Sequence, residues 1–349
     1  MKTLNKARWI IGILSMFVML WAQAYPGENI VLDPATGNYI ITYWDDEEPA
    51  GLEKTTFVPA TKINPTIRSK FRLDGVDSVA YGYVLSNGAS AKQAIVGFSL
   101  EQIGLVTGER GLPPPSAAAT EVENVIFANM SAISSPEDWR GNIYRVRNQS
   151  RIAWRPGSLQ AGGVHAGRTV AGFGFSSPAL PGMSTARMKG LGAVFGYAGE
   201  GPPADSAIIA ELDRLIKNDF IAHPTAIPSI VVPVPFDAAV LLGRIQAHVQ
   251  SWVGMQLLDA SFAAQLDRYI AASADAYRYN QLKVGKEHIE TLRKMLKKEH
   301  QDLGRDEEHE SDSSQGRDDG RKSALIDRLA ARVLDFDLRY VLRRMGEKD

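Results

Sequence analysis

The sequence predicts a mainly β N-terminal antiparallel sandwich followed by an all-α C-terminal helical bundle. Between residues 28 and 195, apolar residues alternate with a period of two and turn-forming residues recur at short intervals, which is typical of antiparallel strands. From residue 204 onward, apolar residues recur at three- and four-residue spacing, which is typical of amphipathic helices. Because no helix-period segment lies between the strands, a sandwich is favoured over alternating β-α units.

The first 24 residues have the three parts of a secretory signal peptide. Three basic residues precede an apolar run at 9–21, and Ala22-Gln23-Ala24 follows. This small-x-small pattern predicts cleavage before Tyr25. The apolar run is shorter than the roughly 20 residues that span a bilayer, although an uncleaved anchor remains the alternative. We therefore expect a secreted or periplasmic protein without a stable transmembrane anchor after cleavage.

Composition excludes several classes of function. The 349 residues carry a formal net charge of −1, and removal of residues 1–24 leaves 36 basic and 40 acidic residues. Nucleic-acid binding needs a surplus of cations, so it is not expected. The chain has no cysteine, which excludes disulfides, thiolate nucleophiles and cysteine-ligated zinc. The fold must therefore be stabilised by its hydrophobic cores.

The strands are predicted from alternating apolar runs and from the turn formers between them. A hairpin is expected around residues 33–38, and residues 79–85 alternate between apolar and small side chains. Further strands are predicted at 94–100, 122–130, 143–147, 151–155, 170–176 and 183–189. The stretch 104–120 contains three consecutive prolines and is expected to be a long loop.

The predicted domain order is a signal peptide, a sandwich, a connector and a bundle. The corresponding ranges are 1–24, 25–198, 199–236 and 237–349. Helices are expected at 204–218, 237–258, 259–279, 285–302 and 323–345. The proline-rich stretch 224–235 predicts an extended connector, and the acidic stretch 303–322 predicts a disordered loop within the bundle.

Two parts of the chain resemble known exported bacterial proteins. The stretches 81–93 and 172–182 resemble segments of the β-sandwich in uncharacterised exported proteins. The helices around Leu266 and Ile289, with the ending 334–342, resemble a FIMAH-type helical domain, from which the acidic insertion 305–322 departs. These resemblances imply a fold and bring no catalytic residues.

Tryptophans are the candidate ligand-binding residues. Trp44 and Trp139 are both expected to offer an aromatic platform to a sugar, and Trp139 is expected to be the more exposed of the two. Trp154 is expected in the core. The run Asp45, Asp46, Glu47 and Glu48 directly follows Trp44; its four carboxylates form a candidate calcium site or a solvated loop.

The usual catalytic signatures are missing. There is no Gly-x-Ser-x-Gly nucleophile elbow and no HExxH pair. A glycoside hydrolase needs two carboxylates beside a sugar ring, and the candidate members are Asp74, Asp77, Glu137 and Asp138. The arginines near the C-terminus alternate with Asp327, Asp335 and Asp337, and these are expected to form ion pairs on a helix surface.

Taken together, these observations predict an exported, non-enzymatic binding or structural protein of the cell envelope or extracellular space. Its expected partner is an envelope protein or a polysaccharide. A carbohydrate-active hydrolase and a calcium-dependent adhesin-like module are the alternatives. No cofactor is expected apart from calcium.

Overall fold

A computed structural model describes residues 25–45, 51–101, 133–146, 149–159, 162–195, 201–301, 303 and 324–346. The chain forms two compact units. Unit 1 comprises the chain up to Pro59 together with Gly192–Asn218. Unit 2 comprises Ala60–Leu191 and the chain from Asp219 onward. The predicted sandwich range, 25–198, is therefore divided between the two units, because residues 193–195 pair with an N-terminal strand and the helix at 207–217 packs on the same sheet.

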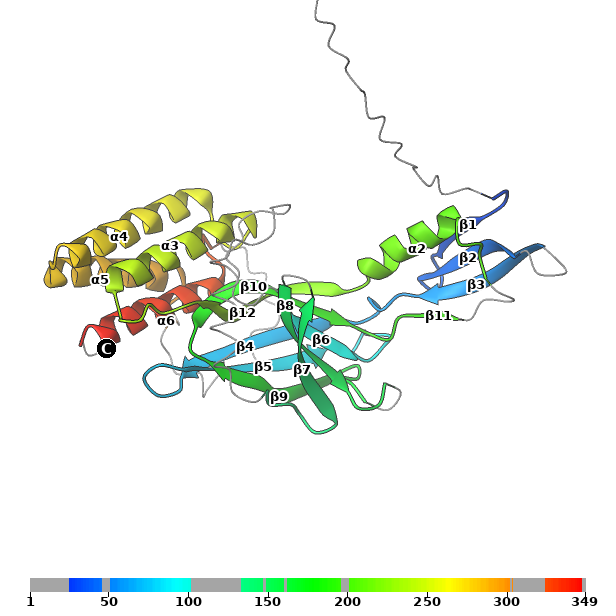
Figure 1. The fold of residues 1–349 in the computed structure, drawn as a ribbon, viewed down its shortest axis with the longest axis horizontal. Helices are drawn as coiled ribbons and strands as arrows, with labels where there is room; N and C mark the ends of the chain where they lie inside the picture. The colour runs from blue at the N-terminus through cyan, green and yellow to red at the C-terminus, as the bar shows by residue number, and fades with distance from the viewer. Residues whose placement is uncertain are drawn as a thin grey trace, which may run out of the picture. The chain divides into compact units, whose positions relative to one another are not determined.

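Unit 1 is a four-stranded antiparallel sheet with one helix. Its strands have the order β1-β2-β3-β11. They are β1 (Asn29–Asp33), β2 (Asn38–Asp45), β3 (Gly51–Val58) and β11 (Ala193–Phe195). Helix α2 (Ala207–Lys217) covers one face of the sheet (Figure 1). Its Ile208 and Leu212 pack on Ile41, Tyr43 and Phe57.

Local chemistry sets the turns of unit 1. The predicted hairpin between β1 and β2 is confirmed, and the Asp33 carboxylate accepts a hydrogen bond from the Ala35 N–H at 3.0 Å. Gly37 has a φ of +66°, which suits glycine in a tight turn. Ser206 caps helix α2 by accepting from the Ile208 N–H at 3.2 Å.

Unit 2 contains two antiparallel sheets that pack against each other. One has the order β4-β5-β9 and the other β12-β10-β6-β8-β7. Their bounds are β4 (Pro65–Leu73), β5 (Val79–Asn87), β6 (Gly97–Leu100), β7 (Trp139–Val146), β8 (Gln149–Pro156), β9 (Arg168–Ser177), β10 (Leu180–Lys189) and β12 (Ile221–Ile230). Aromatic rings fill the space between the sheets: Tyr83 of β5 meets Phe98 of β6 and Trp154 of β8 at centroid distances of 5.8 and 6.2 Å. The prediction that Trp154 lies in the core is confirmed.

The predicted connector is a strand instead. β12 pairs antiparallel with β10, with Pro224 opposite Thr185 and Pro228 opposite Pro181. It lies at the edge of its sheet, where a proline without an N–H is tolerated on the side that has no neighbouring strand. Its last six residues are buried, and Ala226, Ile227 and Ile230 belong to the hydrophobic core, so the segment is part of the sheet rather than a link between two domains.

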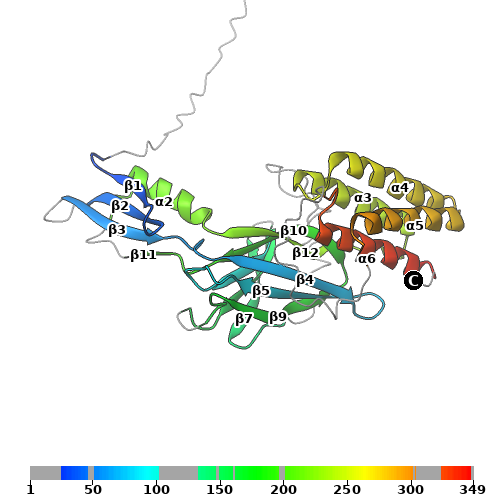
Figure 2. The same ribbon diagram turned by 180° about the vertical axis from the view of Figure 1, so that it is seen from behind.

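The C-terminal part of unit 2 is helical, as predicted. Its described helices are α3 (Ala238–Gly254), α4 (Ala260–Arg278), α5 (Leu282–Glu299) and α6 (Arg328–Arg344). Asp237, Asp259 and Asp327 cap three of them by accepting from backbone N–H groups of the first turn. The four helices pack side by side at one end of the two sheets (Figure 2).

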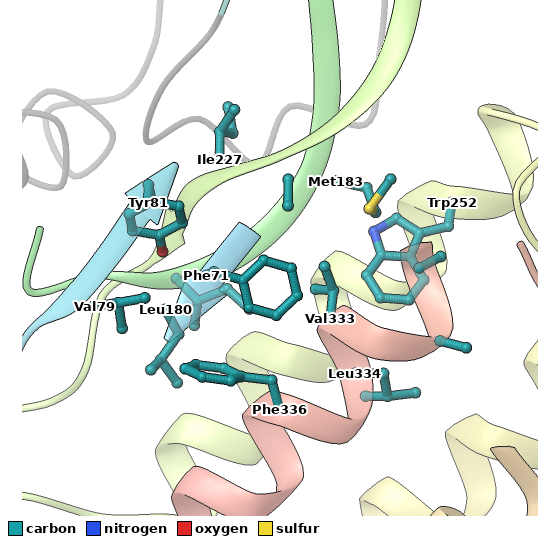
Figure 3. Close-up of a cluster of buried hydrophobic side chains, with 14 of the residues drawn as sticks. Phe71, Val79, Tyr81, Leu180, Met183, Ile227, Trp252, Val333, Leu334 and Phe336 are labelled. Carbon is teal, nitrogen blue, oxygen red and sulfur yellow. The ribbon is translucent and has the colours of Figure 1, made fainter. Parts of the chain in front are cut away.

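The helices and the sheets of unit 2 share one hydrophobic core. Helix α6 lies against β10 and β12, and it is also packed by α3 and α5. Phe71 of β4, Leu180 of β10 and Phe336 of α6 meet in this region, and Trp252 of α3 lies beside Met183 (Figure 3). The predicted fold class, a mainly β N-terminal part with a helical C-terminal part, is confirmed. The bundle is fused to the sandwich through this core.

Several predictions concern residues outside the described part of the chain. These are the leader 1–24, the long loop 104–120, the strand 122–130 and nearly all of the acidic loop 303–322. They stay predictions.

Candidate functional site

Trp44 lies on the face of the unit 1 sheet opposite helix α2. Side chains alternate along a strand, so Ile41 and Tyr43, which pack under α2, place Trp44 on the other face. Trp44 is half-buried, and its cross-strand partner Leu52 is 46% exposed. Val31, on the same face, is 55% exposed. This face therefore offers an aromatic ring and aliphatic side chains to solvent.

Polar groups surround Trp44 on the same face. Thr42 lies two residues before it, and the register places Asn29 and Lys54 on either side of Thr42. Asn29 and Lys54 are exposed. We name the surface formed by Asn29, Val31, Ile40, Thr42, Trp44, Leu52, Lys54 and Thr56 the Trp44 face. It combines a flat apolar platform with amide, hydroxyl and ammonium donors.

The backbone of Trp44 is held by a carboxylate. The paired register of β1 and β2 ends at Asn29 and Thr42, so the Trp44 N–H lies beyond it. This N–H donates to Glu28 Oε1 at 3.1 Å. Glu28 Oε2 accepts from Ser206 Oγ at 2.8 Å and so links β2 to the start of α2. Sequence reasoning missed Glu28, because a single carboxylate in a turn belongs to no motif.

The acidic run after Trp44 is described only at its first residue. Asp45 is 5% exposed and ends β2 opposite Gly51, on the face that α2 covers. Asp46, Glu47 and Glu48 lie outside the described residues. Across the described ranges, no group of three or more His, Cys, Asp or Glu side chains is placed to hold a metal ion.

Trp139 lies in a different environment from the one expected. The expectation that it is exposed is wrong: its side chain is 7% exposed, and its ring packs edge-on against Phe173 with centroids 5.0 Å apart. Asp138, immediately before it, has a φ of +63°. This left-handed turn directs the chain so that Trp139 enters β7 facing the core. Trp44 belongs to unit 1 and Trp139 to unit 2.

Two of the four candidate hydrolytic carboxylates are bound to other parts of unit 2. Asp74 accepts from Ser176 Oγ at 2.9 Å, and Asp77 forms an ion pair with Arg344 of α6. Arg344 also lies 4.8 Å from the ring centroid of Phe236. These contacts tie the β4–β5 loop to the end of the bundle. The other two, Glu137 and Asp138, are exposed.

Helix α6 contains two buried acidic residues. Asp335 forms the expected ion pair at four-residue spacing, with Arg339. The expectation that Asp335 and Asp337 lie on the helix surface is wrong, since they are 2% and 1% exposed. Asp335 lies 2.8 Å from Arg293 Nε and 3.1 Å from Arg339 Nε, so its charge is compensated. In the described structure, Asp337 Oδ1 makes no hydrogen bond. Burial raises the pKa of Asp337 well above its ordinary value, which favours the protonated, neutral carboxyl group.

A buried histidine lies where α3 packs on β10. His248 is 3% exposed, and neither ring nitrogen has a hydrogen-bond partner in the described structure. Burial lowers its pKa to about 4. The ring packs directly over Gly182, where an added Cβ would lie 1.9 Å from His248 Nε2. The neutral imidazole therefore acts as a core side chain, and glycine is needed opposite it.

Sequence patterns contained signals for both buried groups. His248 falls at helical spacing between Ile245 and Trp252, which are buried. Asp337 lies between Phe336 and Leu338, and α6 has apolar residues on every side. An ionisable residue within such a pattern has no solvent face available. Both groups lie in the shared core of unit 2, so they affect stability and offer no surface to a ligand.

None of the helices in the described ranges is both long and apolar enough to cross a membrane. Comparison of the chain with protein-family models, with curated proteins and with solved structures gave no significant match. The resemblance of the C-terminal helices to FIMAH-type domains therefore stays a prediction.

Proposed function

We propose that this protein is an exported, non-enzymatic binding protein that recognises a polysaccharide of the cell envelope or extracellular matrix through the Trp44 face. The observation that carries the proposal is the half-buried Trp44 ring among exposed polar and aliphatic side chains on the face opposite α2. The export part of the proposal rests on residues 1–24, which have the pattern of a cleaved leader.

The chemistry of this face suits a sugar. An indole ring presents a flat apolar surface against which the C–H face of a pyranose packs, while its edge remains polar. Sugar hydroxyls donate and accept hydrogen bonds, and the exposed side chains of Asn29 and Lys54 supply both kinds of group. The face lies on paired strands, so these groups are held at fixed spacing before a ligand arrives.

Partners of another chemistry are less well supported. A protein partner of ordinary affinity buries about 800 Å² on each side, usually around several large anchor residues. The Trp44 face has one large aromatic residue, and the side chains around it are small aliphatic and polar ones. This composition favours a small repeating ligand that contacts one ring at a time.

A non-enzymatic role is supported by the environment of the carboxylates. Glycoside hydrolysis places two carboxyl groups about 5 to 9.5 Å apart beside the substrate. Asp74 and Asp77 are held by Ser176 and Arg344, and the buried Asp335 is held by Arg293. These bonds explain the three carboxylates structurally without any catalytic role.

Binding to immobilised polysaccharides tests the proposal. The chain beginning at Tyr25 is incubated with cellulose, chitin, peptidoglycan sacculi and matrix polysaccharide, and the bound fraction is measured against concentration. We expect saturable binding to at least one polymer and at least a tenfold weaker Kd for Trp44→Ala, because loss of a central aromatic contact costs more than about 1.4 kcal/mol.

The matched control removes an exposed aromatic residue elsewhere. Tyr279 lies at the end of α4 in unit 2 and is 72% exposed. Tyr279→Ala should bind as the unsubstituted chain does. Failure of the unsubstituted chain to bind any polymer, or equal binding by Trp44→Ala, would refute the proposal.

A further inference from the structure

The carboxylate of Glu28 gathers three hydrogen-bond donors from three parts of unit 1. Oε1 accepts from the Trp44 N–H of β2 at 3.1 Å. Oε2 accepts from the capping hydroxyl Ser206 Oγ at 2.8 Å and from the Tyr25 N–H at 3.4 Å. A half-buried carboxylate thus connects the Trp44 face, the start of α2 and Tyr25.

A tight turn presents the Tyr25 nitrogen to Glu28. The Glu28 N–H donates to the Tyr25 carbonyl oxygen at 3.2 Å, which closes the turn Tyr25-Pro26-Gly27-Glu28. Proline at the second position and a glycine with a φ of +89° at the third are typical of a type II turn. Gly27 also passes close to β3, since an added Cβ would lie 2.6 Å from Leu52 Cδ1.

The side chain of Tyr25 is fixed as well. Its hydroxyl donates to Asp205 Oδ1 at 3.0 Å, immediately before the capping residue Ser206. Tyr25 is therefore held by its side chain at the start of α2 and by its backbone at Glu28. Tyr25 is also the residue that the leader sequence predicts as the first of the mature chain.

We propose that Glu28 is a binding site for the α-ammonium group that leader removal creates on Tyr25. Hydrolysis of the Ala24–Tyr25 peptide bond by a signal peptidase consumes one water molecule, leaves a carboxylate on Ala24 and leaves an amine on Tyr25 that takes up a proton. One neutral N–H donor thereby becomes a cation with three donors, beside a carboxylate oxygen already 3.4 Å away. Charge-assisted hydrogen bonds are about twice as strong as neutral ones.

The new ion pair stabilises the candidate binding face. Because the same carboxylate holds the Trp44 N–H and the capping hydroxyl of α2, fixing Glu28 also fixes the strand that presents Trp44 and the helix on the opposite face. Unit 1 then reaches its full stability only after cleavage. This inference rests on the export proposed above and not on the identity of the ligand.

Hydrogen exchange of the Trp44 amide tests the site. One chain begins at Tyr25 and the other at Gln23, so that the second keeps the Tyr25 nitrogen as an amide. At pH 7 we expect the Trp44 amide to exchange roughly fivefold more slowly in the chain that begins at Tyr25, as a partly exposed ion pair of about 1 kcal/mol produces. Equal rates would overturn the inference.

Two charge variants distinguish a specific ion pair with Glu28 from a general effect of removing a negative charge. In Glu28→Gln, which keeps an acceptor but loses the charge, the difference between the two chains should vanish. In Glu53→Gln, which removes an exposed carboxylate from β3 of the same sheet, the difference should persist. A difference that survives Glu28→Gln, or that Glu53→Gln abolishes, would contradict a specific pair with Glu28.

A pH series on the unsubstituted chains gives an independent test. An α-amine has an ordinary pKa of about 7.7 to 8.0, and a neighbouring carboxylate favours its charged form. After correction for intrinsic exchange, the Trp44 amide should exchange more slowly in the chain that begins at Tyr25 at pH 6 to 7, and this difference should be lost by about pH 10. A difference in exchange rate that is unchanged at pH 10 would overturn the inference.

Failure of this site and failure of the proposed function are distinguishable. N-terminal sequencing of exported protein should find Tyr25 first, and another first residue would overturn the inference. If the chain binds no polysaccharide, the exchange comparison can still be made, because it uses no ligand.

Discussion

Phe336 of helix α6 packs edge-on against Phe71 of strand β4, with ring centroids 5.2 Å apart and planes at 86°. This pair joins the bundle to the sandwich inside unit 2. Both rings are buried, and Arg332 lies 5.5 Å from the ring centroid of Phe71. The contact makes the sheet and the helices one cooperative structure.

Phe336→Ala should therefore destabilise the sandwich as well as the bundle. Removal of a buried phenylalanine ring costs about 3–5 kcal/mol. We expect urea unfolding followed by far-UV circular dichroism and by core tryptophan fluorescence to shift together to a lower midpoint. If the helical signal shifted while the tryptophan signal kept its midpoint, the shared core would not be cooperative. Tyr279→Ala serves as the exposed control.

Protonation of His248 should destabilise unit 2 in acid. Its folded pKa is lowered to about 4 by burial, whereas the unfolded chain binds the proton near the ordinary value of 6.5. The unfolded state therefore binds more protons between pH 6.5 and 4, so stability falls as pH falls through this window, by about 3 kcal/mol.

His248→Asn isolates this contribution, because asparagine does not titrate. The free energy of unfolding is measured at pH 7 and pH 4.5 for both chains. The unsubstituted chain should lose more stability between the two pH values than His248→Asn does. Equal losses would assign the pH dependence to other groups.

Asp337 should have the opposite pH dependence. Burial raises its folded pKa. The contribution of Asp337 to the free energy of unfolding is therefore fully present below about pH 3.8 and is lost as pH rises through the folded pKa. Asp337→Asn removes the cost of keeping a proton at neutral pH, and we expect it to stabilise unit 2 by at least about 1 kcal/mol at pH 7.

Asp335→Asn is the matched control on the same helix. Asp335 is equally buried but is paired with Arg293 and Arg339. Loss of its charge leaves two cations without a counterion, so this variant should lose stability, by about 3 kcal/mol. Stabilisation by both variants, or by neither, would contradict the different environments assigned to the two carboxyl groups.

Local sequence patterns were sufficient to predict those strands and helices whose apolar residues follow the period of the element. Residues 79–85 alternate and form β5, and Asp237 and Asp259 begin helices as capping residues. β12 was missed because Pro224 and Pro228 suggest a connector. Its place at a sheet edge, which makes those prolines acceptable, depends on pairing with a distant strand.

The candidate site was predicted only in part. Trp44 could be proposed from residue type and from its place in a hairpin, and its side-chain direction follows from strand alternation. The burial of Trp139 depends on the ring of Phe173, 34 positions later in the chain. Glu28 acts through Tyr25, Trp44 and Ser206 together. Such convergence arises from the fold and leaves no local motif.

The most direct measurement of the central claim is a titration of the mature chain with oligosaccharides of the polymer that it binds, followed through its indole N–H resonances by NMR. Tryptophans at positions 44, 139, 154 and 252 report on both units. The account predicts that the Trp44 resonance shifts in a saturable manner while the three buried indoles of unit 2 do not. A shift confined to those three, with Trp44 unchanged, would contradict it.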